Sequence, residues 1–261
     1  MTYSVNRDPW MEHAKQNIFA DYAVRVSLEA KNKDLLKFGR SNQVQTSSST
    51  LAILPTGIYN ETYVASNLIN SIISTDAGDT ESVVIEGHTI SGSDLTFVIQ
   101  TVALTGQTVV ALPTPLARVS RVANVSATDL AGVVSVTETD TYAAGVPVTP
   151  ALVHLQIRAG KNQSEKGATS ISSTDYWVVT RFYADMLEKT AASAEVILEV
   201  RQAGGVFRQV AAVSVSENHR ASFEFKPYLV VPSNSDIRLV SVASAAGKDI
   251  SGGIIGSLLK A

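Results

Sequence analysis

The chain has 261 residues, a net charge of -3 and no cysteine. Disulfide bonds and thiolate zinc sites are therefore excluded, and the chain lacks the concentrated basic region that nucleic-acid binding requires. Charged residues make up only 17% of the chain, against roughly 25% in an average soluble protein, and a mixture this rich in Val, Ser and Thr favours β-sheets.

No run of apolar residues approaches the roughly 20 that are needed to cross a membrane. A secretion signal, with a basic stretch followed by an apolar one, is absent from the opening residues MTYSVNRDPW. We therefore expect a protein that binds no membrane, is made in a cytoplasm and stays there until it is assembled or released.

A short helix is predicted near the N-terminus. Asp8 is a good N-cap, and Pro9 suits the first helical position because no amide hydrogen is needed there. Apolar side chains then form one stripe at four-residue spacing: Trp10, Ala14, Ile18 and Tyr22, with Met11 and Phe19 beside it. The helix either packs on its own domain or acts as an arm that binds a neighbouring subunit, since so short a helix has little stability alone. For the arm, the predicted partner-binding residues are Trp10, Ile18, Phe19 and Tyr22.

The rest of the chain predicts an all-β fold of tandem β-sandwich or jelly-roll-like domains. Residues 1–45 are predicted to be the helix and a connector arm, residues 46–150 the first sandwich and residues 151–261 the second. Short segments rich in Val, Ile and Thr alternate with turn residues throughout. Residues 195–201 show the period-two alternation of a strand with one buried face, and residues 203–205 predict a hairpin turn after it.

Side chains that could carry catalysis or bind a metal are scattered. None of the four histidines has a partner at metal-ligand spacing. His88 and His219 fall in predicted exposed turns, and His154 in an apolar strand that would bury it. A G-x-S-x-G nucleophile elbow is absent. The acidic run with Asp76, Asp79 and Glu81 could offer oxygen ligands to calcium, although acidic turns are usually only solvated. We expect no enzymatic activity, no cofactor and no metal.

Several segments resemble, in the same order, a recurrent pattern of tailed-bacteriophage virion structural proteins. In the first half these are LLKFGRSNQVQT, ESVVIEGHT and TVALTGQTVVALPTPLARVSRVAN. In the second half they are GGVFRQVAAVSV, FKPYLVVPSNSDIRLVSVAS and KDISGGIIGSLL. The resemblance covers residues 35–261 loosely, and it departs from the pattern where Gly253-Ile254-Ile255 replaces an aromatic residue. It implies a particle component more firmly than a position in the capsid or the tail.

The first functional hypothesis is a decoration or cement protein that binds across capsid subunits. Its partners would be the major capsid protein and further copies of itself, in a symmetric oligomer such as a trimer. Small residues and low charge favour the extensive close contacts that such a role requires. In this hypothesis the protein is located in the virion, after synthesis in the host cytoplasm.

Two alternatives remain. The protein could be a tail-side component, such as a head–tail or tail-fibre adaptor, with portal, tail or fibre proteins as partners. It could also be a carbohydrate-binding adhesion module, because β-sandwiches often carry sugar sites. A sugar site would need an exposed aromatic platform, for which the candidates are Tyr142, Tyr176 and Trp177.

Overall fold

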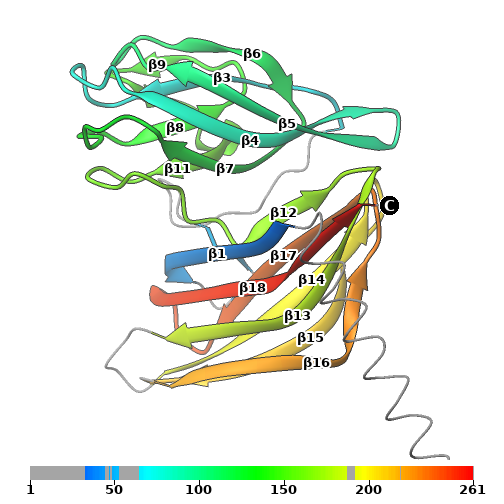
Figure 1. Cartoon of the computed structure of the whole chain (residues 1–261). Coiled ribbons are helices and arrows are strands. Elements are labelled where there is room, and N and C mark those ends of the chain that lie inside the picture. The colour runs from blue at the N-terminus through cyan, green and yellow to red at the C-terminus, as the bar shows by residue number, and fades with distance from the viewer. Residues whose placement is uncertain are drawn as a thin grey trace, which may run out of the picture.

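A computed structural model describes residues 33–44, 47, 49–52, 65–186, 192–217 and 219–260 (Figure 1). Within this part of the chain the fold is built from antiparallel strands, and its one helical element is the 3-10 turn η1 (Pro150–Leu152). The predicted all-β sandwich class is confirmed. The predicted N-terminal helix lies outside the described residues.

Two β-sandwiches make up the described chain, and Figure 1 shows one above the other. Sandwich 1 packs the sheet β11-β8-β3-β6 against the sheet β5-β4-β7. Its strands are β3 (Ile69–Ser74), β4 (Ser82–Ser91), β5 (Asp94–Ala103), β6 (Val110–Leu116), β7 (Arg118–Asn124), β8 (Val134–Thr137) and β11 (Val153–Ile157). A small hairpin of β9 (Tyr142–Ala143) and β10 (Val146–Pro147) accompanies them.

Sandwich 2 packs sheet A, ordered β1-β18-β13-β16, against sheet B, ordered β12-β17-β14-β15, with β2 added to β17. The strands of sheet A are β1 (Lys33–Val44), β18 (Lys248–Lys260), β13 (Asp175–Met186) and β16 (Arg220–Val231). Those of sheet B are β2 (Ser49–Thr50), β12 (Ala168–Ile171), β17 (Ser235–Ala243), β14 (Ser193–Gln202) and β15 (Arg208–Ser216).

Each sandwich has its own hydrophobic core. In sandwich 2 the fully buried Trp177 and Phe182 of β13 face Val196 and Leu198 of β14. The alternation predicted for residues 195–201 is confirmed, since Val196 and Leu198 are buried while Glu195 is exposed. Residues 69–157 supply a second, separate core to sandwich 1. The two cores share no residue.

The domain boundaries differ from those expected. Residues 33–44 were expected in a connector, but β1 pairs along β18 and is an edge strand of sandwich 2. Residues 153–157 were expected in the second sandwich, but β11 pairs with β8 in sandwich 1. Sandwich 1 is therefore inserted between β2 and β12 of sandwich 2.

The two ends of the insertion lie side by side. Ala52 and Lys166 form a β-bridge, and the amide of Gly167 donates to the carbonyl of Leu51 at 2.8 Å. Gly39 of β1 packs against this crossing so closely that a Cβ there would lie 2.2 Å from the Gly167 nitrogen. The glycine of the KFGR segment is thus required for the close approach of backbones where the chain enters and leaves sandwich 1.

Candidate functional site

The two sandwiches meet at a buried carboxylate, Asp236 of β17. Arg118, on β7 of sandwich 1, donates from Nε to Asp236 Oδ1 at 3.1 Å. Arg201 of β14 donates from Nε to Oδ2 at 3.0 Å, and Ser170 of β12 donates to Oδ1. Asp236 is fully buried and Arg118 is 5% exposed. One carboxylate therefore joins two strands of sandwich 2 to the edge of sandwich 1.

Two lysines of sandwich 2 complete this junction. Lys37 of β1 donates from Nζ to the Ser120 carbonyl at 3.2 Å, and Lys166 donates to the Val119 carbonyl at 2.9 Å. Both carbonyls belong to β7, the edge strand of its sheet, so the lysines satisfy backbone acceptors that a neighbouring strand would otherwise take. Burial lowers the pKa of Lys37 from 10.5 to about 8.

The prediction that His88 lies in an exposed turn is wrong. His88 lies within β4 and is 2% exposed, with its ring 5.3 Å from that of Phe97. Its Nδ1 is buried without a hydrogen-bond partner, and burial lowers the pKa of the imidazole to about 4. The residue faces the junction because its cross-strand neighbour on β7 is Arg118. The Gly-His pair looks like a turn in the sequence, but Gly87 is needed because a Cβ there would meet the Arg118 carbonyl at 2.3 Å.

The other two described histidines agree with the sequence. His154 is 3% exposed, and its Nε2 lies 3.0 Å from Glu138 Oε1. His219 is exposed and follows β15 in a turn. In the described part of the chain no group of three His, Asp or Glu side chains is placed to hold a metal ion.

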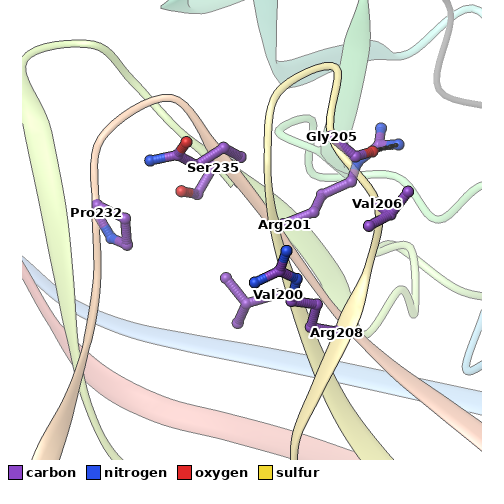
Figure 2. Close-up of a pocket in the computed structure, with 8 residues that line it drawn as sticks. Val200, Arg201, Gly205, Val206, Arg208, Pro232 and Ser235 are labelled. Carbon is purple, nitrogen blue, oxygen red and sulfur yellow. Dashed lines mark hydrogen bonds between the residues drawn. The ribbon is translucent and has the colours of Figure 1, made fainter.

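A pocket of about 300 Å³ opens beside the junction, at the end of sandwich 2 (Figure 2). It lies between the β14–β15 hairpin and the β16–β17 connection, and Figure 2 shows Arg208 pointing into it across from Pro232 and Ser235. Its lining residues are Val200, Arg201, Gln202, Gly205, Val206, Arg208, Pro232 and Ser235. Among these described residues there is neither a carboxylate nor a histidine, so the lining offers no general base for Ser235.

The hairpin beside this pocket is fixed by an aromatic side chain. The ring of Phe207 lies against two guanidinium groups, with the Arg201 Cζ 4.5 Å and the Arg238 Cζ 3.8 Å from the ring centroid. Arg201 is bound to Asp236, and Arg238 is bound to Glu199 at 2.8 Å. Phe207 therefore covers two ion pairs on the outer face of sheet B.

At the far end of sandwich 1, Asp79 holds several loops together. Its carboxylate accepts hydrogen bonds from the amides of Ala131 and Gly132, at 2.8 and 3.0 Å, and from the Ser74 hydroxyl. Asp79 is 2% exposed. Both of its oxygens are already used by protein donors, so the structure gives the predicted calcium candidate a role in loop packing.

Replacing Asp79 with alanine should destabilise sandwich 1 by about 2–3 kcal/mol, because it leaves buried amide donors without an acceptor. Denaturant unfolding would measure the change. Asp76→Ala is the matched control, since Asp76 only caps the exposed amide of Gly78 and its loss should cost under about 1 kcal/mol. Equal effects of the two substitutions would contradict this role for Asp79.

The three candidates for the aromatic platform of a carbohydrate-binding module differ in burial, and Tyr176 is half-buried. Trp177 is fully buried in the core of sandwich 2. Tyr142 is half-buried, and its hydroxyl lies 2.8 Å from that of Thr137. The predicted partner-binding residues Trp10, Ile18, Phe19 and Tyr22 lie outside the described residues. Sequence reasoning missed the junction residues Lys37, Arg118, Lys166 and Asp236, which have no common motif and come together only through the fold.

No protein family and no curated protein matches the sequence. Among solved structures, the chain is similar to the carbohydrate-binding module TmCBM61 in complex with β-1,4-galactotriose, with 21% identity and a TM-score of 0.19. This match covers 36% of the chain and 59% of that module.

Two viral structures also show similarity. The infectious bursal disease virus Gx strain structure has 11% identity and a TM-score of 0.24, over 87% of this chain and 71% of that one. The cowpea mosaic virus top component has 7% identity and a TM-score of 0.23, over 74% and 84%. Similarities this low carry no argument about function. Within the described residues, no helix is long and apolar enough to cross a membrane.

Proposed function

We propose that the protein is a non-enzymatic structural component of a bacteriophage virion that decorates the capsid by binding across capsid subunits. Its partners are the major capsid protein and further copies of itself. The proposal starts from the ordered segments that resemble tailed-phage virion proteins.

The observation that carries the proposal is where those segments lie in the fold. LLKFGRSNQVQT contains Lys37, ESVVIEGHT contains His88, and the long third segment contains Arg118. GGVFRQVAAVSV contains Phe207, and FKPYLVVPSNSDIRLVSVAS contains Asp236. These residues build the junction and the hairpin packed beside it. That these segments supply residues to one architecture of two joined sandwiches supports the proposal.

A locked two-domain body suits a protein that bridges subunits of a shell. A buried ion pair and a lysine side chain bound to a backbone carbonyl join the sandwiches, so each sandwich can support the other under load. The low fraction of charged residues favours extensive contact with neighbouring subunits. The pocket lining lacks a catalytic base, which is in keeping with a binding role.

The copy number in purified virions, relative to the major capsid protein, tests this function. Quantitative mass spectrometry should give a ratio near one, or a simple fraction of one. A ratio of a few per cent would instead assign the protein to the tail or connector. Absence from virions would overturn both assignments.

Removing residues 1–32 should leave both sandwiches folded and abolish binding to particles. The cut falls before β1, so every described strand remains, while the predicted contact residues Trp10, Ile18, Phe19 and Tyr22 are lost. Unfolding midpoint and co-sedimentation with particles would measure the two effects. A truncated protein that binds particles as well as the full chain would exclude the arm as the anchor.

A further inference from the structure

The strand β5 of sandwich 1 has an edge that is open to a further strand. It is the outer strand of the sheet β5-β4-β7, and Figure 1 shows it beside β4. Among the described strands it pairs only with β4, from Asp94 opposite Ser91 to Ala103 opposite Ser82, without a bulge. Because this ladder is unbroken, the backbone groups of β5 point alternately toward β4 and toward the free side.

Hydrogen bonds at the two ends of β5 show which residues face the free side. Leu95 accepts from the amide of Ser173 at 2.8 Å and donates its own amide to Asn234 Oδ1 at 2.9 Å, both away from β4. The amide of Leu104 donates to the carbonyl of Glu81, on the β4 side, at 2.9 Å. Alternation from Leu95 therefore identifies the residues whose backbone groups point to the free side as Phe97, Ile99, Thr101 and Ala103.

These four residues can receive an incoming strand. In the described part of the chain no group bonds to their amides and carbonyls on the free side. Their side chains are exposed as well, Phe97 by 43% and Ile99 by 55%. The side chain of Gln100, which points the other way, exchanges two hydrogen bonds with the backbone of Thr114, at 2.9 and 3.0 Å. The strand β6 thus contacts the inner face of β5.

Three other edge strands carry features that oppose such pairing, and β5 does not. β6 contains two prolines and β16 contains Pro227, while Lys37 and Lys166 occupy carbonyls at the edge of β7. Residues 95–104 of β5, LTFVIQTVAL, hold neither a charge nor a proline. An exposed apolar edge of this kind is a template for another strand.

A second copy of β5 fits this edge. When two copies run antiparallel about a two-fold axis at Gln100, Phe97 lies opposite Ala103 of the copy and Ile99 lies opposite Thr101. All four free positions are then bonded, and apolar and β-branched side chains stand side by side on one face. Asp94, the one charged residue of β5, lies outside the paired residues, so no like charges are opposed.

We propose that the free edge of β5 is the interface through which two copies of this chain form an antiparallel dimer. The interface gives a surface to the further copies named in the proposed function, although its evidence is the edge alone. A dimer formed by a protein that is absent from virions would support the interface and reject the proposed function. A protein that is present in virions but monomeric in solution would do the reverse.

Sedimentation equilibrium of the full-length protein over a range of concentrations tests the dimer. The parent should reach the mass of two chains. Ile99→Lys should raise the dissociation constant by about ten-fold or more, because it places two like charges close together across the axis. Val125→Lys is the matched control, since Val125 is 56% exposed and lies just beyond β7. A parent that is monomeric at every concentration, or a control that dissociates as readily as Ile99→Lys, would overturn the proposal.

Engineered cysteines test the register without disturbing the apolar edge as a whole. The chain has no cysteine of its own. Ile99→Cys and Thr101→Cys, mixed and diluted so that subunits exchange, should form a disulfide between copies, because directly opposed residues have Cα atoms about 5.5 Å apart. Either variant alone should not, since its two cysteines would be diagonal neighbours about 7–8 Å apart. A mixture that cross-links no more than the single variants would overturn the proposal.

Discussion

Replacing Asp236 with alanine is expected to lower the free energy of unfolding by about 3–5 kcal/mol, as removal of one partner from a buried ion pair does. The substitution leaves Arg118, which is 5% exposed, without its carboxylate at the junction. It also removes the acceptor of Arg201 and of the Ser170 hydroxyl. A buried guanidinium cannot lose its charge to escape this cost, because arginine stays protonated in proteins. Chemical denaturation at neutral pH would measure the change.

The ion pair between Arg40 and Asp249 is the matched control. The side chains of Arg40 and Asp249 are 28% and 20% exposed, so water can replace the lost contact. Asp249→Ala should therefore cost at most about 1 kcal/mol. Comparable losses in the two variants would show that the junction carries no special share of the stability.

The same substitution should change how the two sandwiches unfold. Each has its own core, so their cooperativity depends on the junction between them. In the parent protein we expect one transition, and in Asp236→Ala two, with near-ultraviolet circular dichroism reporting sandwich 2 through Trp177. A single transition in the variant would show that the insertion points at Ala52 and Lys166 are enough to couple the domains.

The elements that could be predicted from the sequence are those recognised from residues close together in the chain. Alternation at residues 195–201 gave β14, and the Gly204 and Gly205 turn that follows has the positive φ expected of a hairpin, +79° at Gly204. His154 was correctly placed in a buried strand because its neighbours are apolar. Such features depend only on residues close in the chain, which is why pattern alone is sufficient for them.

Elements that depend on distant contacts were missed. β1 looked like a connector because two of its inward positions hold Lys37 and Gly39, which face the other sandwich and a backbone crossing rather than a hydrophobic core. Arg118 and Asp236 are 118 residues apart in the chain, so no spacing rule connects them. The inserted domain was likewise hidden, since its ends at Ala52 and Lys166 become neighbours only after folding.

Lowering the pH should lower the free energy of unfolding because of His88. Burial at the junction lowers the pKa of His88 from 6.5 to about 4. Above pH 6.5 the imidazole is neutral in both the folded and the unfolded chain, and stability does not depend on it. Between pH 6.5 and 4 the unfolded chain binds a proton that the folded chain does not, so stability falls as the pH falls. From pH 7 to pH 4.5 the loss should be about 2–3 kcal/mol, at 1.36 kcal/mol per pKa unit.

Lys37 should affect the free energy of unfolding in the alkaline range. With its pKa lowered to about 8, the folded protein carries the cost of a buried charge below that pH. As the pH rises from 8 to 10.5 the folded chain releases a proton that the unfolded chain keeps, so this contribution to stability rises with pH. Lys37→Met should remove the alkaline rise. It should also make the acid loss somewhat smaller, because the charge of Lys37 helps to lower the pKa of His88.

His88→Leu separates the histidine from the carboxylates that also titrate in acid. Leucine has a similar volume and no charge, so the variant should keep the acid sensitivity of every other group and lose only that of His88. The free energies of unfolding at pH 7 and pH 4.5 should therefore differ less in the variant than in the parent, by about 2–3 kcal/mol. His219→Leu, at an exposed turn, should behave as the parent. If His88→Leu were as acid-sensitive as the parent, His88 would have to be reached by water, and the junction would open before the sandwiches unfold.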